Sequence, residues 1–300
     1  MTSPIRRRWL ALTGLLGVTP LLKACSPLRL INAVVPSDTH TRLADQAYGP
    51  AERQRVDVYL PVNLAPGAPM AVFFYGGSWS SGDRADYRFA GEALASRGIV
   101  TLVADYRLSP EVRYPTFLQD CALALRWARD RARDFGASPE RLHLVGHSAG
   151  AYNAAMLALD ARWLGRLGRR TDRLAGLVGL AGPYDFLPIV NPDVKPVFNR
   201  PGVEDPAPAD SQPLRHVSAA APRSLLIAAR DDALVNPQRN TGGLAQALRD
   251  PFSTLGLSAH GDAPAPALYR MPQGRLGQCQ GLLAWLQSLD PARHPPKVMP

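Results

Sequence analysis

Short apolar runs alternate with helical patterns along most of the chain. Residues 55–61 alternate between apolar and polar positions, which is typical of a strand. Continuous apolar runs, typical of strands buried on both faces, lie within residues 70–83, 98–110, 140–148, 174–185 and 223–235. Helices are predicted between these runs, at 116–135, 149–163 and 237–250. This alternation predicts an α/β fold, in which a mostly parallel central sheet carries helices on both faces.

The first of these helices has an apolar stripe and a basic side. Its apolar residues recur at helical spacing and would pack on the sheet: Phe117, Cys121, Ala124, Leu125 and Ala128. Asp130 and Asp134 interrupt the arginines on and near it, which are Arg113, Arg126, Arg129, Arg131 and Arg133. This mixture of charges favours a solvated helix face over a phosphate-binding stripe.

The composition fits one folded domain of moderate charge. The 300 residues are 46% hydrophobic and 20% charged, which is enough for one large core. The formal net charge is +9, but residues 1–24 hold four basic side chains and no acidic one, so the remainder carries 9 − 4 = +5. No recognition motif accompanies that charge, so we expect no nucleic-acid partner. Strands and helices resume after the proline-rich stretch 191–213, which we therefore expect to be a flap over the site.

The N-terminus has the pattern of an export signal. Three arginines at 6–8 precede an apolar run that has signal-peptide length and is short for a membrane span. The arginines resemble a twin-arginine signal, and Leu22-Lys23-Ala24-Cys25 resembles the bacterial lipoprotein signal. An N-terminal helix that stays on the protein is the alternative.

The lipoprotein resemblance implies a division of the chain and a location. It implies a signal peptide at 1–24, a lipidated Cys25 with a tether over 25–44, and a single folded domain over 45–300. Ser26, in place of an aspartate, implies the periplasmic face of the outer membrane in a Gram-negative host, with the lipid anchor as the only membrane contact. Cys121 is expected to be a buried thiol, with a disulfide to Cys279 as the alternative.

The stretch LHLVGHSAG (142–150) carries a nucleophile motif. Gly146-His147-Ser148-Ala149-Gly150 fits G-x-S-x-G between an apolar strand and a helix of small residues. Glycines on both sides let the chain turn sharply, so Ser148 Oγ would stand at the tip of the turn. A serine that merely caps the helix is the alternative.

Two further segments supply groups that a serine nucleophile needs. Paired glycines in Tyr75-Gly76-Gly77-Ser78-Trp79 follow an early strand and let backbone N–H groups point at one spot. The N–H groups of Gly76, Gly77 and Ala149 would form an oxyanion hole, with a plain glycine turn as the alternative. Later in the chain, Asp232 is the preferred acid to orient a base, with Asp231 solvated.

Four stretches together resemble the α/β-hydrolase fold, and in particular the bacterial lipoprotein-type carboxylesterases with a feruloyl-esterase-like (BD-FAE-like) domain. They are FFYGGSWSSGDRADYRFAGEALASRG, ADYRLSPEVRYPTFLQDCALALRWARD, LVGHSAGAYNAAMLALD and GLAGPYDFLPI, within roughly residues 45–250. The resemblance implies that Ser148 is the nucleophile and Asp232 the acid. It also implies a small-molecule ester substrate, with no metal, organic cofactor or protein partner.

The catalytic histidine of that family is missing from its usual place. After its last strand the family carries a Gly-His turn, whereas LYRMPQGRLGQCQG has Arg275 there. Arginine stays protonated near neutral pH and cannot act as the general base. His260 follows Asp232 by 28 residues, close to the family's separation, but it precedes the apparent last strand. His294 lies in a proline-rich tail.

The remaining histidines have structural explanations. We expect the ring of His147 to point away from Ser148 Oγ, as in other turns of this type. The positions of His40, His143 and His216 favour surface or core roles.

Two functions stay open at this point. The first is a serine carboxylic-ester hydrolase that forms an acyl-enzyme on Ser148, with His260 as the candidate base. The second is a pseudoenzyme that binds a small acyl or aromatic ligand without turnover, because Arg275 replaces the base. The tail from about 251 onward resembles the family poorly, so it is either a diverged or a sequence-shifted terminus.

Overall fold

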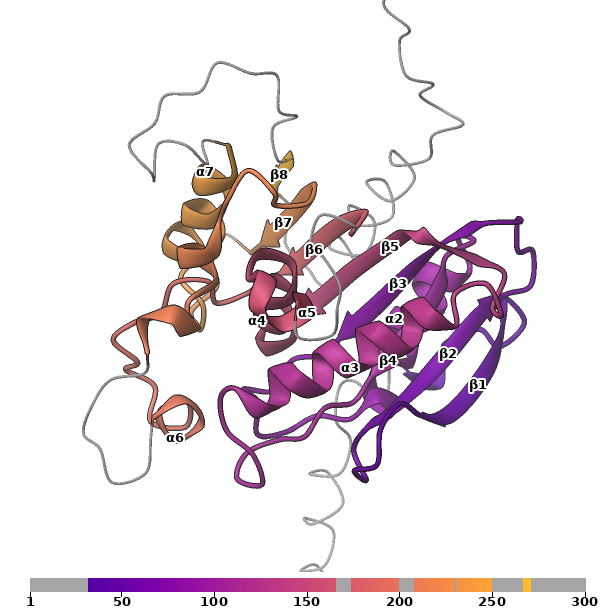
Figure 1. Ribbon diagram of the computed structural model, residues 1–300, viewed down its shortest axis with the longest axis horizontal. Coiled ribbons are helices and arrows are strands. Elements are labelled where there is room, and N and C mark those ends of the chain that lie inside the picture. The colour runs from indigo at the N-terminus through magenta and orange to yellow at the C-terminus, as the bar shows by residue number, and fades with distance from the viewer. Residues whose placement is uncertain (1–31, 166–173, 200–207, 230, 250–266, 271–300) are drawn as a thin grey trace, which may run out of the picture.

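The described part of the chain builds one eight-stranded sheet. The computed structural model describes residues 32–165, 174–199, 208–229, 231–249 and 267–270. The strands lie in the order β1-β2-β4-β3-β5-β6-β7-β8 (Figure 1). Their bounds are β1 His40–Ala47, β2 Arg55–Pro61, β3 Ala68–Phe74, β4 Val100–Ala104, β5 Ala137–His147, β6 Gly176–Leu180, β7 Ser224–Ala228 and β8 Ala267–Arg270. β2 runs antiparallel to both β1 and β4, and all other neighbouring pairs are parallel, which confirms the predicted sheet type.

Helices cover both faces of this sheet. α3 (Thr116–Asp130) and α4 (Ala149–Leu159) lie on one face, and α2 (Arg88–Ala95) lies on the other (Figure 1). The remaining helical elements are short: η2 Arg84–Tyr87, α5 Ala161–Gly165, α6 Lys195–Phe198, η4 Ala209–Ser211, η5 Pro213–His216, the π-turn η6 Gln238–Gly242, and α7 Gly243–Arg249. The two-sided cover predicted from the sequence is therefore confirmed.

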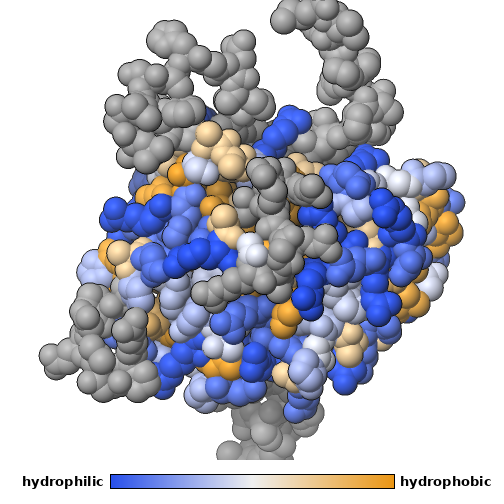
Figure 2. Space-filling model, viewed as in Figure 1, coloured by the Kyte–Doolittle hydropathy of each residue, from blue (hydrophilic) through white to orange (hydrophobic). Residues whose placement is uncertain are grey.

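α3 shows both sides that its sequence predicts. All five residues of its apolar stripe are buried, and Cys121 is a free thiol in the core. On the outer side Arg126 is exposed, as are Arg131 and Arg133 just beyond the helix. The Arg131 guanidinium lies 4.8 Å from the centre of the Trp127 ring. Figure 2 shows a mostly hydrophilic surface on this face, which agrees with a solvated helix.

The folded sheet starts earlier than the predicted boundary. β1 begins at His40 and pairs antiparallel with β2, from His40 opposite Pro61 to Ala47 opposite Arg55. Residues 40–44 are therefore strand and do not belong to the 25–44 tether. The sequence of β1 hides this, because most of its side chains are exposed or half-buried on an edge strand and give no apolar run.

Two predicted helices are interrupted. The helix expected over 149–163 divides at Asp160, which has extended backbone (φ −95°, ψ 104°) and whose Oδ1 accepts the Arg162 N–H at 3.0 Å. The helix expected over 237–250 begins instead as the π-turn Gln238–Gly242 and becomes α-helical at Gly243. At Asp160, a local polar bond thus sets a boundary that apolar periodicity does not show.

The carboxyl ends of four central strands meet at one edge of the sheet. The register pairs Phe74 with Gly146, His147 with Leu180, and Leu180 with Ile227. The loops after β3, β5, β6 and β7 consequently start side by side, as ligand sites of open α/β sheets require. No helix among the described residues is both long and apolar enough to cross a membrane.

Candidate active site

Ser148 stands on a sharp turn between β5 and α4. Its backbone has φ 52° and ψ −119°, a conformation that side-chain-bearing residues rarely adopt. A Cβ on Gly146 would lie 2.2 Å from the Gly150 carbonyl oxygen, and one on Gly150 would lie 2.0 Å from the Phe74 oxygen. The Ser148 N–H donates to the Leu180 carbonyl at 2.8 Å. The turn therefore has the geometry that the motif predicts, and both flanking glycines are sterically required.

The loop after β3 lies against this turn. A Cβ on Gly76 would lie 2.9 Å from the Ser148 Cβ. Gly77 has φ 134°, and a Cβ there would lie 2.1 Å from the Ser81 carbonyl oxygen. Ala149, the first residue of α4, directly follows Ser148. The structure thus brings together Ser148 and the three residues predicted to form an oxyanion hole.

A buried polar cluster fixes the residue before the glycine loop. The Tyr75 hydroxyl donates to Asp105 Oδ1 at 2.7 Å and accepts from Arg53 Nη2 at 2.7 Å. The Tyr106 hydroxyl donates to the Tyr75 carbonyl at 2.8 Å. Burial and the nearby Asp105 carboxylate raise the pKa of Tyr75 far above its usual value, so it is a neutral donor here. The sequence did not predict this cluster, and its one local signal is Asp105 at the end of an apolar strand.

The same cluster continues outward through Arg84. Its guanidinium bonds Asp57 Oδ1 at 3.1 Å and Asp45 Oδ1 at 2.7 Å, and it also bonds Asp105 Oδ2. Burial lowers the pKa of Arg84, but the Asp105 and Asp57 carboxylates together raise it by more, so the net shift is upward. η2, which begins at Arg84, is thereby tied to β1, β2 and the end of β4.

An aromatic cluster borders the other end of the glycine loop. The Trp79 ring lies 4.9 Å from that of Phe198, 5.2 Å from Tyr152 and 6.2 Å from Phe186, measured between ring centres. Phe198 belongs to α6, in the segment 191–213 that we expected to be a flap. The described part of this segment therefore packs on Trp79, two residues beyond Gly77.

Asp232 lies in the loop after β7, half-buried, while Asp231 beside it is exposed. Its Oδ1 accepts the backbone N–H groups of Leu234 and Val235, at 2.9 and 3.0 Å. These bonds hold the carboxylate in a turn at the edge of the sheet that carries Ser148.

The described histidines fall at the places that a structural role explains. His143 is buried in β5, where its Nδ1 donates to the Arg141 carbonyl at 3.0 Å, and burial lowers its pKa to about 4. His216 Nε2 bonds the Asp210 carbonyl at 2.7 Å. The His40 ring lies 5.1 Å from that of Tyr59, and burial lowers its pKa. His147 packs beside the glycine loop, with Nδ1 2.9 Å from where a Cβ on Gly76 would lie.

Several predicted residues lie outside the described part of the chain: Cys25, His260, Arg275, Cys279 and His294. The direction of β8 still bears on which residue could act as the base, because β8 is parallel to β7. His260 precedes the first residue of β8 by seven positions, and Arg275 follows its last residue by five. Since β8 ends at the same edge of the sheet as β5, its C-terminal side is the side on which Ser148 stands.

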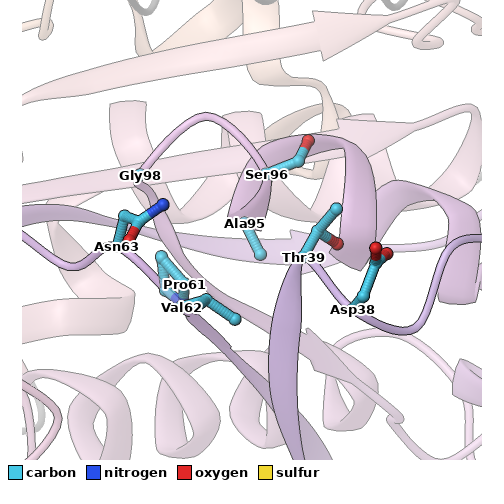
Figure 3. A pocket seen from close by; sticks show the side chains of 8 residues that line it. All are labelled: Asp38, Thr39, Pro61, Val62, Asn63, Ala95, Ser96 and Gly98. Carbon is cyan, nitrogen blue, oxygen red and sulfur yellow. The ribbon is translucent and has the colours of Figure 1, made fainter.

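A separate shallow pocket of ≈ 240 Å³ lies near the ends of β2 and α2 (Figure 3). Its lining residues are Asp38, Thr39, Pro61, Val62, Asn63, Ala95, Ser96 and Gly98. None of the residues predicted for catalysis borders it. Among the described residues, no three His, Cys, Asp or Glu side chains gather in a way that could hold a metal ion.

Comparison with known proteins finds esterases. The family model described as BD-FAE matches residues 56–248. A probable carboxylic ester hydrolase of Mycobacterium tuberculosis, LipM, is 27% identical over 242 residues, which are 75% of this chain and 55% of LipM. The carboxylesterase NlhH of the same species is 38% identical over 112 residues, 37% of this chain and 35% of NlhH. The chain thus spans about half or less of the length of these curated relatives.

Solved esterase structures share the fold. An arylesterase superposes with a TM-score of 0.66 at 21% identity, covering 88% of this chain and 90% of its own. A truncated carbohydrate esterase from gut microbiota gives a TM-score of 0.65 at 17% identity, covering 85% and 98%. With the sheet order described above, these likenesses confirm the α/β-hydrolase class expected from the sequence.

Proposed function

Because the chain belongs to the BD-FAE family, whose match covers more than half of it, we propose that it is a serine carboxylic-ester hydrolase acting through an acyl-enzyme on Ser148. The esterase relatives support ester hydrolysis in general. The observation that carries the serine mechanism is the contact between the elbow and the glycine loop, where Gly76 leaves no room for a Cβ beside Ser148.

In this proposal each step uses a group at the shared strand edge. Ser148 Oγ attacks the ester carbonyl carbon while a base takes its proton, and the carbonyl oxygen becomes an oxyanion. The N–H groups of Gly76, Gly77 and Ala149 donate to that oxyanion. The intermediate then expels the alcohol, which receives the proton, and leaves an acyl-serine. Water then attacks the acyl-serine carbonyl carbon while the base takes a proton from it. The second intermediate expels Ser148 Oγ, which regains the proton, and the acid is released.

The base remains the open part of the mechanism. Asp232 would orient it from the loop after β7, and His260 is the candidate. The direction of β8 disfavours His260, because that residue precedes the strand whereas Arg275 follows it. This observation supports a second candidate function, a pseudoenzyme that binds a small acyl or aromatic ligand. Loss of one triad member usually leaves a residual enhancement of about 10³–10⁴ over water.

Turnover and labelling of the full chain test the two functions. The hydrolase proposal predicts hydrolysis of p-nitrophenyl acetate and butyrate, loss of that activity in Ser148→Ala, and fluorophosphonate labelling mapped to Ser148 by peptide mass spectrometry. Wild-type turnover equal to that of Ser148→Ala supports the pseudoenzyme.

Two substitutions then identify the base. His260→Ala abolishes turnover only if His260 takes the proton. Arg275→His restores the family's residue and should raise turnover strongly if the family's geometry holds after β8. Unchanged rates in both variants would exclude both positions.

We also propose that the protein is exported and anchored through a lipid on Cys25, facing the periplasm at the outer membrane. The support is the sequence of residues 1–26 alone. Metabolic labelling with palmitate in a Gram-negative host should mark the wild type and leave Cys25→Ala unlabelled. Recovery of unlabelled wild type from the soluble fraction would contradict the anchor.

A further inference from the structure

We infer that Asn153 is a positioning residue, which holds Trp79, and with it the glycine loop of Gly76 and Gly77, in place against the start of α4. The inference rests on the proposed function for its catalytic meaning. Its structural basis is the buried hydrogen bond from Trp79 Nε1 to Asn153 Oδ1, at 3.0 Å.

The glycine loop has a backbone that needs such support. Gly77, Ser78 and Trp79 have φ values of 134°, 51° and 58° in succession. For a serine and a tryptophan this left-handed region costs of order 1–3 kcal/mol each, and it persists only where surrounding contacts impose it. Contacts on both sides of the loop must therefore hold this backbone in place beside Ser148.

The Trp79 side chain supplies the contact at the far side. Trp79 is 3% exposed, and its ring packs against the aromatic cluster, with Phe198 at 4.9 Å and Tyr152 at 5.2 Å between ring centres. Ring packing alone allows the indole to slide and rotate in its pocket, whereas one directional bond fixes it. The bond to Asn153 is that directional contact.

Asn153 is fully buried and its orientation is fixed by chemistry. An indole N–H only donates, so the Asn153 carbonyl oxygen must face it. The Asn153 side chain also interacts with the buried Cys121 thiol on α3. A polar side chain in such a place costs stability unless it is bonded, so a purely structural role would be filled better by leucine or methionine.

The position of Asn153 links the two halves of the proposed oxyanion hole. Asn153 and Ala149 are four residues apart on α4 and lie on one face of that helix. Ala149 offers one donor, and the loop that Trp79 ends offers the other two. The Trp79–Asn153 bond therefore ties both sources of donors to one rigid helix, and a displacement of about 1 Å between them can cost about 10²-fold in rate.

The test compares Asn153→Leu with Leu157→Ala, which removes fully buried side-chain volume from the same helix. In Asn153→Leu we expect kcat for p-nitrophenyl acetate to fall 10- to 100-fold with KM within about twofold, because the loss falls on the transition state. Leu157→Ala should lose at least as much thermal stability and keep kcat within about twofold. Equal effects on kcat in the two variants would overturn the inference.

A second measurement is independent of turnover. Hydrogen exchange followed by mass spectrometry should show faster exchange across residues 74–82 in Asn153→Leu and no such change in Leu157→Ala. Trp79→Phe should give the same faster exchange, and the double variant should add little to either single variant. Unchanged exchange in Asn153→Leu overturns the inference, whereas an inactive wild type with the expected exchange pattern counts only against the hydrolase proposal.

Discussion

Four glycines leave no space for a β-carbon, two at the elbow (Gly146 and Gly150) and two in the glycine loop (Gly76 and Gly77). Gly146 and Gly150 face backbone atoms across the turn, at 2.2 and 2.0 Å from an added Cβ. Gly76 instead faces the side chains of His147 and Ser148, both at 2.9 Å. A methyl group at Gly76 would thus displace the loop from Ser148 without breaking the turn itself.

Gly76→Ala is therefore expected to remain folded and to lose activity. The added methyl moves the loop by tenths of an ångström or more, and loss of one oxyanion donor costs about 10²–10³ in turnover. We expect kcat for p-nitrophenyl acetate to fall at least 10²-fold. Gly243→Ala is the matched control, since an added Cβ there meets nothing within 4 Å. Equal kcat in the two variants would show that the loop does not act on the reaction.

His143 gives the fold a dependence on acid. Its pKa is about 4 in the folded protein because of burial, against an ordinary value of 6.5. Between these values the unfolded chain binds a proton that the folded chain does not, so stability falls as the pH is lowered from 6.5 towards 4. The full difference is roughly 3 kcal/mol.

His143→Gln is expected to flatten that dependence. Glutamine does not titrate and keeps an N–H donor for the Arg141 carbonyl. Urea denaturation of both proteins at pH 7 and pH 4.5 measures the difference. If the wild type and the variant lose the same free energy of unfolding over that interval, His143 is not the group responsible.

Among elements, apolar runs predicted the interior of the fold and little of its edge. The runs around β3 to β7 correspond to strands because side chains buried on both faces leave a continuous apolar signature. β1 has no such signature, and its pairing with β2 depends on a partner eight or more residues away. β1 is therefore a strand because it pairs with β2, and its own sequence does not indicate it.

In the candidate site, too, some features could be predicted from the sequence and others could not. The Ser148 elbow and Gly76 were predictable because the required residues are adjacent in the sequence. The contacts that hold them are not adjacent: Tyr75 bonds Asp105 across 30 residues, and Trp79 bonds Asn153 across 74. Such pairs leave no periodic pattern in a single sequence, so they cannot be predicted from it.

Phe198 of α6 anchors the described part of the segment 191–213, which is expected to form a flap. Phe198 is 2% exposed and contacts five aromatic rings, among them Trp79 and Phe117. Phe198→Ala should cost roughly 3–5 kcal/mol of that packing. Because α6 is short, we expect local detachment, seen as faster proteolysis within 191–199. Val190→Ala, at a side chain 82% exposed, is the control and should leave proteolysis unchanged.

In the molecule as a whole, two kinds of interaction hold the sheet together. Its centre is apolar, whereas the end formed by β1, β2 and β4 is fastened by charges. The Asp57 carboxylate is fully buried, with Arg42 Nη2 at 2.6 Å and Arg84 Nε at 3.1 Å, and Asp105 is also almost fully buried. Arg84 is the residue that these two carboxylates share.

Removing Arg84 should consequently act on the whole fold. Arg84→Leu removes one cationic partner from each of two buried carboxylates, while Asp57 keeps Arg42 and Asp105 keeps Arg53. Loss of a buried partner costs up to about 3–5 kcal/mol, or roughly 10 °C in Tm for a protein of this size. The control is Arg133→Leu, whose partner Glu140 is 3.9 Å away, with both side chains at least 70% exposed. Solvent screens exposed pairs of this kind and they contribute little to stability, so Tm should hardly move. Thermal denaturation of the three proteins at pH 7 measures the difference, and similar Tm values for the two variants would mean that apolar packing alone secures this end of the sheet.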